Sequence, residues 1–248
     1  RALVALVAAV IAATNLSACE PPPPRLQLMV TTTVVGSDDD PGDGTCHSTS
    51  AGGCSLEAAI DEGNTAVDGA DITIPPGDYA AFSAGVTGDV RIAAAAPAST
   101  RIGDSYGVHL TVLQGGRLEI TDLNPGGVGF PWPFHVNVGG GPRHGILIAR
   151  RSVLSAAPGV HPVIPLLIEE PGVAILVDSL VHSPEYESVV NRGTLIAGNS
   201  SLLTSFTFIA LTTGWTAAGQ SSLRGSAIAR FDVFPGDGGG CDGLSPIS

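Results

Sequence analysis

The chain contains no lysine, and aromatic residues make up only 5% of it. Its 11 arginines are outnumbered by 23 acidic residues, which gives a formal net charge of −12. A nucleic-acid partner requires a basic face, so this charge balance argues against one. Apolar residues make up 44% of the chain, which excludes wholesale disorder and predicts a core. The 33 glycines and 19 prolines, together with abundant Ala, Val, Ile and Leu, favour many short strands joined by turns.

The N-terminal segment 1–18 has the pattern of an export signal. One arginine precedes a run of small apolar residues that is too short and too weakly flanked for a lasting membrane span. The run ends in Leu-Ser-Ala-Cys at 16–19, which resembles the lipobox of bacterial lipoproteins, whose cysteine carries lipid and becomes the new N-terminus. We therefore expect a signal peptide at 1–18 and lipidation of Cys19. An ordinary signal peptide with an incidental cysteine is the alternative.

A proline-rich spacer follows this cysteine, in the sequence EPPPP at 20–24. Consecutive prolines form a stiff extended chain that holds a domain away from a surface. Residues 19–29 are therefore predicted to be a lipid-anchor site and tether. The combination predicts an exported protein of the bacterial cell envelope, held by its lipid to the membrane and displayed on the outer surface.

Two of the four cysteines, Cys46 and Cys54, lie 8 positions apart in one glycine-containing loop. Export implies an oxidising compartment, where close cysteines tend to pair. Closing this loop is expected to stabilise the fold by roughly 2–3 kcal/mol. The loop has no CxxC motif, and no nearby His or Cys pair completes a zinc set. The sequence therefore predicts a structural disulfide.

Residues 55–64 predict a short amphipathic helix directly after this loop. Ser55 can accept a backbone N–H bond as the N-cap, and Glu57 lies in the first turn, where the helix dipole favours an anion. The apolar face is formed by Leu56, Ala59 and Ile60. A Gly-Asn pair at 63–64 gives a stop signal. Such a helix requires an apolar surface to pack on.

A family resemblance covers residues 30 to 80. The segment TVVGSDDDPGDGTCHSTSAGGCSLEAAIDEGN and the following GADITIPPGDY resemble the N-terminal CSLREA segment of secreted bacterial right-handed parallel β-helix proteins. The two cysteines, the run after them, the asparagine and a strand followed by Gly-x-Tyr carry the match, which departs where the usual CSLREAI reads CSLEAAI. The resemblance implies an N-terminal cap whose helix plugs the open end of a solenoid.

Short apolar strands followed by a Ser-x-Leu-like step recur in the second half of the chain. The serines of these steps, Ser152, Ser179, Ser200 and Ser226, follow one another at similar intervals, each of which fits a single turn of a parallel β-helix. The segment 116–123 matches an earlier rung. We therefore predict an all-β fold, a right-handed parallel β-helix (solenoid) over 81–248 with a short disulfide-stapled N-terminal capping helix. An ordinary β-sandwich is the alternative.

Two features of this segment interrupt the rhythm. Glycine and proline clusters at 124–144 predict a long loop that projects from one rung. Cys241 has no partner once the other three cysteines are assigned. We expect that the chain is truncated and that the partner of Cys241 lies beyond Ser248.

The residues just before the aligned serines are candidates for a stack on adjacent turns. They are Arg151, Asp178, Asn199 and Gly225, with Asp122 in the earlier rung. Hydrolases of polysaccharides need an acid together with a base or nucleophile, and lyases need a calcium site plus a basic residue. The aligned positions offer one carboxylate, so we assign no catalytic residue. Polar side chains at such corners usually bond to the turn backbone.

Three other groups of residues have binding chemistry. Asp38, Asp40 and Asp43 could hold Ca²⁺, but their spacing is not that of an EF-hand and favours a solvated turn. The aromatic residues of the predicted loop could stack on sugar rings or fold back over the barrel. These are Phe130, Trp132 and Phe134. The six histidines show no HxH or HExxH pattern, so no metal site or cofactor is predicted.

These patterns predict a lipid-anchored surface β-helix that acts as a display, adhesion or contact module without catalysis. Its expected partners are a polysaccharide or a surface protein. A polysaccharide lyase or glycoside hydrolase on the same scaffold is one alternative, and a purely structural repeat protein is another, because one fold hosts many functions.

Overall fold

The computed structural model describes residues 23–50, 52–102, 107–123, 134–139, 143–155, 164–183, 189–204, 215–219 and 222–224. This part of the chain is mostly strand, with one α-helix near its N-terminal end. No helix within it is long and apolar enough to cross a membrane. The predicted signal peptide, the predicted lipidation site Cys19 and the unassigned Cys241 lie outside the described residues.

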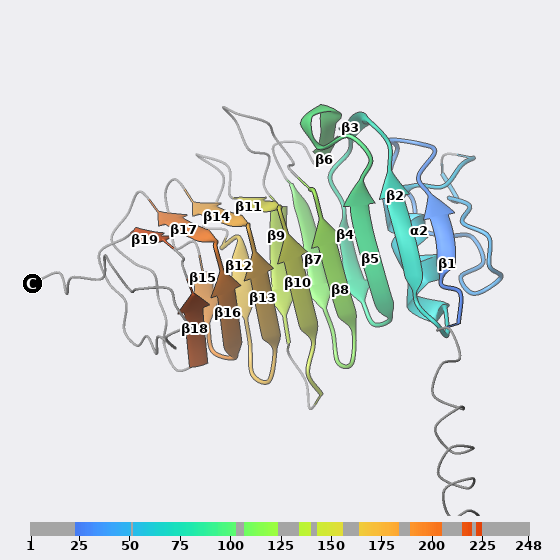
Figure 1. Ribbon diagram of the computed structural model, residues 1–248. Helices are drawn as coiled ribbons and strands as arrows, with labels where there is room; N and C mark the ends of the chain where they lie inside the picture. Colours follow the sequence, from blue (N-terminus) through green and yellow to red (C-terminus); the bar gives the residue numbers. More distant parts are fainter. Residues whose placement is uncertain are drawn as a thin grey trace, which may run out of the picture.

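An eight-stranded parallel sheet, here called the front sheet, forms the long face of the molecule that is turned toward the viewer (Figure 1). Its strands come from successive repeats, and each pairs in parallel with the strand of the next repeat. In spatial order they are β1 (Leu26–Met29), β2 (Ala70–Ile74), β5 (Asp89–Ala94), β8 (Arg117–Thr121), β10 (Ile146–Arg150), β13 (Val173–Val177), β16 (Thr194–Gly198) and β18 (Trp215–Gly219).

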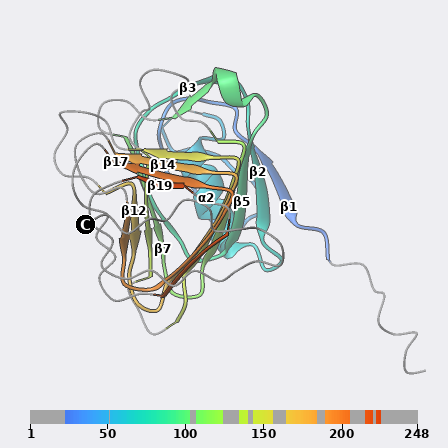
Figure 2. The same ribbon diagram turned by 60° about the vertical axis from the view of Figure 1, so that its left-hand side comes forward.

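A nine-stranded sheet and a two-stranded sheet form the other walls (Figure 2). One arm of the larger sheet contains β4 (Ser83–Val86), β7 (Val108–Val112), β9 (Phe134–Val138), β12 (Leu166–Ile168) and β15 (Val189–Asn191). The other arm contains β11 (Val153–Ser155), β14 (Leu180–Ser183), β17 (Ser201–Thr204) and β19 (Ser222–Arg224). A single antiparallel contact between Ser155 and Phe134 joins the arms. The small sheet pairs β3 (Gly77–Tyr79) with β6 (Thr100–Ile102), just after the 3₁₀ turn Pro97–Ser99.

The chain winds through these walls as a right-handed solenoid. It rises through β10 in the front sheet, crosses through β11, returns through β12 and re-enters the front sheet as β13, one strand further along (Figure 1). Parallel pairing requires such crossover connections, which a sandwich of antiparallel hairpins does not supply. The predicted parallel β-helix is confirmed, and the β-sandwich alternative is wrong.

Where the structure describes the side chains of the front strands, alternate residues point into the solenoid and stack on their counterparts in the next repeat. One such column contains Leu118, Leu147, Ala174 and Leu195, and each of these side chains is 0% exposed. Fully burying a leucine side chain contributes roughly 1.5–3 kcal/mol. Because side chains alternate between the two faces of a strand, the outward residues are free to carry charge and polar groups.

Helix α2 (Leu56–Thr65) covers the N-terminal end of the solenoid, next to β1 and β2 (Figure 1). The Ser55 hydroxyl accepts the backbone N–H of Ala58 at 3.0 Å and so forms the N-cap. The disulfide between Cys46 and Cys54 lies at the start of the helix. The apolar side of the helix is buried and packs on β2, β4 and β5. The predicted disulfide-stapled capping helix is confirmed.

The strand pairing corrects one predicted boundary and one predicted alignment. The segment assigned to the tether, 19–29, ends in β1, which pairs with β2 and belongs to the fold. The serine alignment at Ser226 is wrong, because Ser222 pairs with Ser201 and this repeat is therefore shorter than the alignment required. Several serines occur near this point in the sequence, and only strand register selects among them. Ser226 and Gly225 themselves lie outside the described residues.

Candidate functional site

One corner of the solenoid, where the chain leaves the front sheet, is formed by four residues with positive φ. They are Asp122 (56°), Arg151 (46°), Asp178 (50°) and Asn199 (47°), and we call them the corner ladder. This left-handed region is uncommon for residues other than glycine, and Asp and Asn are enriched in it. The front strands pair in register up to this corner, so Arg151, Asp178 and Asn199 stack on adjacent turns as predicted, with Asp122 one rung earlier, whereas the predicted Gly225 lies outside the described residues.

A ladder of buried serines lies directly behind the corner. The Ser152 hydroxyl accepts the backbone N–H of Leu123 at 3.1 Å. The Ser179 hydroxyl accepts the N–H of Ser152 at 3.3 Å, and the Ser200 hydroxyl accepts the N–H of Ser179 at 3.1 Å. Each serine also donates to the carbonyl two residues before it. The corner backbone is therefore satisfied within the fold, which fixes the position of the exposed residue in each rung.

The exposed side chains of the corner ladder form hydrogen-bonded pairs along the stack. Arg151 donates twice to Asp122, from Nε to Oδ1 at 2.6 Å and from Nη2 to Oδ2 at 2.8 Å. This bidentate hydrogen bonding lowers the pKa of Asp122 and raises the pKa of Arg151. Further along, Asn199 Nδ2 donates to Asp178 Oδ1 at 2.5 Å. The corner thus offers a guanidinium, carboxylates and an amide in a row.

An open groove runs over these residues. It is lined by Arg151, Ser152, Val153, Asp178, Ser179, Leu180 and Asn199. Its hydrogen-bonding groups recur at the spacing of neighbouring strands, about 4.8 Å. Asp122 and Asp178 are the two carboxylates of the stack, but a glycosidase needs one of its carboxyl groups protonated as an acid. Arg151 lowers the pKa of Asp122 and so holds it ionised, which leaves Asp178 as the carboxyl group that would have to act as the acid.

The aromatic candidates for glycan contact are placed only in part. Phe134 is 1% exposed and points inward from β9, so of the two alternatives, glycan contact and packing, it takes the second. The alternation of the strand, rather than the prolines before it, decides its direction. Phe130 and Trp132 lie outside the described residues.

The acidic loop at 38–43 uses its carboxylates to bond to nearby backbone. Asp38 Oδ1 accepts the N–H of His47 at 2.9 Å, and Asp43 Oδ1 accepts the N–H of Thr45 at 2.6 Å. Within the part of the chain that the structure describes, no group of three or more His, Cys, Asp or Glu side chains could hold a metal ion. Asp38, Asp40 and Asp43 are therefore not assembled as a calcium site.

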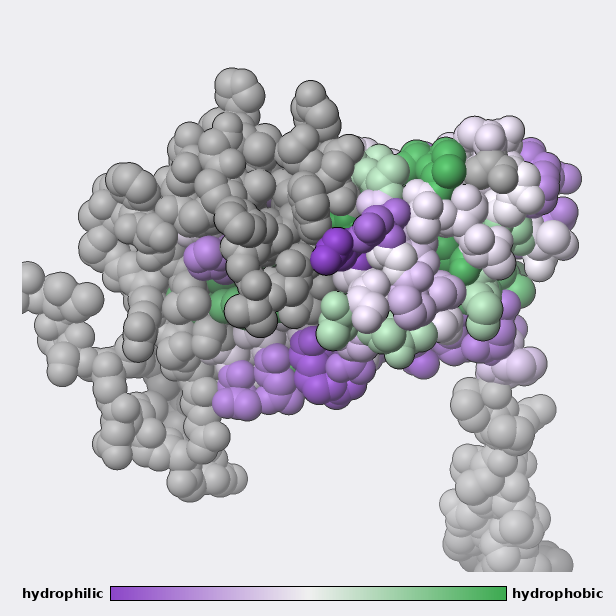
Figure 3. Space-filling view, turned by 90° about the horizontal axis from the view of Figure 1, so that it is seen from above, coloured by the Kyte–Doolittle hydropathy of each residue, from purple (hydrophilic) through white to green (hydrophobic). Residues whose placement is uncertain are grey.

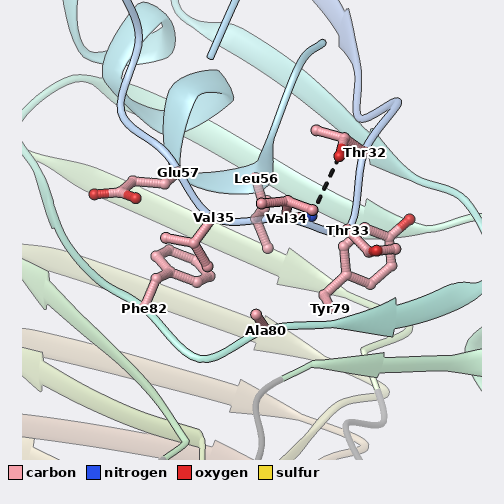
Figure 4. Close-up of a pocket in the computed structure, with 9 residues that line it drawn as sticks. All are labelled: Thr32, Thr33, Val34, Val35, Leu56, Glu57, Tyr79, Ala80 and Phe82. Atoms are coloured by element: carbon pink, nitrogen blue, oxygen red, sulfur yellow. Dashed lines mark hydrogen bonds between the residues drawn. The ribbon is translucent and has the colours of Figure 1, made fainter. Parts of the chain in front are cut away.

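A smaller pocket lies between the 32–35 segment, the start of α2 and β3 (Figure 4). Leu56, Tyr79 and Phe82 line it on its apolar side, and Thr32 Oγ1 accepts the N–H of Val34 at 3.2 Å. The cavity volume is only about 10 Å³. Such a volume holds about one water molecule, so this pocket is not a site for an organic ligand.

An ion-pair network covers the outer face of the front sheet near its N-terminal end. Arg25 bonds to Asp71 at 2.6 Å and to Asp89 at 2.9 Å, and Arg117 bonds to Asp89 at 3.0 Å and to Glu119 at 2.8 Å. Burial raises the pKa of Asp71 and Asp89, but the net pKa of each is lowered, for Asp71 by the hydrogen bond from Gln27 together with the arginines and for Asp89 by the arginines. In the space-filling view, hydrophilic residues form a band along the lower edge of the molecule (Figure 3).

A pair of histidines is the feature that the sequence patterns missed. His109 in β7 and His135 in β9 are partners in the strand register, and their ring centroids are 4.6 Å apart. His135 is 5% exposed, and its burial, together with the charge of His109, lowers its pKa from 6.5 to about 4. The two residues meet across strands of different repeats, so no local spacing motif could have indicated them.

Comparisons of this chain with protein-family models, with curated proteins and with solved structures found no match.

Proposed function

We propose that this protein is an exported, lipid-anchored surface protein whose β-helix presents the corner ladder to a polysaccharide or a surface protein without catalysing a reaction. The observation that carries the proposal is the groove over the ladder, into which Arg151, Asp178 and Asn199 project from consecutive rungs. A hydroxyl-rich chain is the ligand that best matches such a row, because it can donate to the carboxylate and accept from the guanidinium and amide.

Rigidity of the ladder supports this role. The buried serines fix the backbone of each corner, and the stacked core fixes the distance between rungs. Side chains that are already ordered lose less conformational entropy on binding, so a weak hydrogen-bonding surface gains affinity from this preorganisation. A surface display or adhesion module benefits from the same property.

The binding test uses the full chain, oxidised, and a panel of neutral and acidic polysaccharides immobilised for equilibrium binding. Arg151→Ala and Asp178→Ala are expected to raise the Kd for any retained glycan at least tenfold. Arg101→Ala is the matched control, because Arg101 also pairs with an exposed carboxylate, that of Asp78 at 3.5 Å, but lies away from the groove. Equal affinity of all three variants and the wild type would refute the proposed binding surface.

A polysaccharide lyase or glycoside hydrolase is the second candidate, because Asp122, Arg151 and Asp178 place two carboxylates and a basic group in one stack. The same panel is therefore assayed for new reducing ends and unsaturated products, with and without Ca²⁺. Turnover that is lost in Asp178→Asn would make the protein an enzyme. Binding without turnover supports the contact module.

Membrane attachment through Cys19 is the other half of the proposal, and the apolar leader and the proline spacer at 20–24 support it. The chain is expressed in a bacterial host with an added initiating methionine and an alkyne-labelled fatty acid. The wild type is expected to take up the label and to fractionate with the envelope, whereas Cys19→Ser loses both. A wild-type chain without label contradicts the anchor.

A further inference from the structure

The two histidines described above form a side-by-side pair on the outer face of the nine-stranded sheet. His109 and His135 are register partners in the parallel strands β7 and β9, and their rings are tilted by 34°. The residues that flank His135 in β9, Phe134 and Val136, point into the core. Both imidazoles therefore project outward, and His109 is exposed to solvent at the surface of the pair.

Neither ring nitrogen of His135 makes a hydrogen bond within the fold. The side chain is 5% exposed, and both Nδ1 and Nε2 are buried without a hydrogen-bond partner. Native proteins rarely leave buried polar atoms unpaired, because each loses its hydration without compensation. The backbone of Ile164 lies near enough to the ring to favour its protonated form, although no well-formed hydrogen bond connects them. Packing of the two rings against each other does not account for these free nitrogens.

We propose that His109 and His135 bind a divalent first-row transition-metal ion such as Cu²⁺, Ni²⁺ or Zn²⁺, with water completing the coordination. Metal–nitrogen distances of about 2.1 Å and angles of roughly 90–110° between ligands place two imidazole centroids roughly 4.5–5.2 Å apart. The observed separation of 4.6 Å lies within this range. Imidazole nitrogen is a preferred ligand of all three ions.

Two properties of the surroundings favour a cation at this place. The backbone of Ile164 lies beside the ring of His135, and metal-bound histidines commonly donate their second nitrogen's proton to a backbone carbonyl. The net charge of −12 also raises the local concentration of cations.

The experiment uses the full chain purified without a polyhistidine tag and stripped with a chelator that is then removed. Cu²⁺, Ni²⁺, Zn²⁺ and, as a hard-ion control, Ca²⁺ are titrated by calorimetry at pH 7. One saturable site is expected for the transition metals and none for Ca²⁺. His109→Ala and His135→Ala are each expected to raise the Kd at least tenfold. His47→Ala is the matched control, because His47 is an exposed histidine that pairs with Asp39 instead.

A second measurement keeps the proposal testable if His135→Ala fails to fold. Paramagnetic Ni²⁺ or Cu²⁺ is added to wild-type protein with labelled histidine, and the imidazole resonances of His109 and His135 are expected to broaden first. His109→Ala removes only an exposed side chain and is expected to keep the fold. Absence of a saturable site at 0.1 mM metal, loss of binding in His47→Ala, or broadening of other imidazoles alone would each overturn the proposal.

Discussion

Replacing Ser179 with alanine removes the central member of the buried serine ladder. The Ser179 hydroxyl accepts the backbone N–H of Ser152 at 3.3 Å and donates to the carbonyl of Val177 at 2.8 Å. Ser152 is 1% exposed, so its N–H cannot find water in the variant. Alanine fits the site without steric conflict. The substitution therefore removes the acceptor of the buried Ser152 N–H.

The expected cost follows from that unpaired donor. A buried N–H without a partner costs about 1–3 kcal/mol, and the lost donation to Val177 adds little because carbonyls tolerate the loss of one bond better. We expect Ser179→Ala to lower the free energy of unfolding by about 2 kcal/mol. In a solenoid each repeat contacts only its neighbours, so the effect is concentrated near β11 and β14. Hydrogen exchange of the Ser152 amide is expected to accelerate roughly 30-fold, since about 1.4 kcal/mol corresponds to tenfold.

The assay combines urea denaturation of the oxidised full chain with hydrogen exchange read at single amides. Ser200→Ala is expected to reproduce the effect one rung further on, at the amide of Ser179, because Ser200 accepts that N–H at 3.1 Å. Ser83→Ala is the control, because Ser83 is exposed on β4. The reasoning is refuted if Ser179→Ala destabilises the fold no more than Ser83→Ala, or if exchange changes everywhere except at the Ser152 amide.

Three further outcomes are expected. Because the folded pKa of His135 is about 4, below its ordinary value of 6.5, protonation disfavours the fold. The stability contributed by neutral His135 is present above pH 6.5 and falls by about 3 kcal/mol as the pH drops toward 4. Urea denaturation at several pH values should show a smaller fall for His135→Asn. Burial, and then the charge of Asp38, raise the pKa of Asp61, so its stabilising contribution is present at low pH and is lost as the pH rises through the carboxyl range. Asp61→Asn keeps an acceptor for the Asp38 N–H and should raise the melting temperature at pH 7 but not at pH 3; an equal change at both values contradicts this reading. Reduction of the Cys46–Cys54 disulfide, whose cysteines are 8 positions apart, should lower stability by roughly 2–3 kcal/mol in the presence of dithiothreitol, with no shift in a double-serine variant.

The candidate site could be anticipated from the sequence only where its features are local. The serines at 152, 179 and 200 and the polar residue before each of them mark a corner that recurs once per turn, and their stacking follows from that repeat alone. The bidentate pairing of Arg151 with Asp122 was not apparent, because it depends on side-chain direction at positive φ. The sequence counted one carboxylate, Asp178, at the aligned positions and placed Asp122 in the earlier rung, and the strand register joins the two in one stack.

The sequence by itself determined the local conformations and the repeat. A capping serine followed by an acidic residue and an apolar face specifies helix α2, two close cysteines specify the staple, and alternating apolar residues specify strands whose inward faces stack. These features depend on neighbours within a few residues or on a regular period. For that reason they could be recognised without knowing which strands lie side by side.

Only the tertiary structure decided which distant side chains meet. The repeats differ in length, so no fixed alignment of the sequence gives their pairing. Strand register shows that Ser222 is the partner of Ser201, and the last described turn is therefore shorter than the alignment required. A shift of one residue reverses the face on which every side chain lies, and this sends Phe134 into the core and His135 outward to His109. The ion pairs of Arg25 likewise span 46 and 64 positions in the chain. Such contacts depend on hydrogen bonding between whole strands, which no short stretch of sequence encodes.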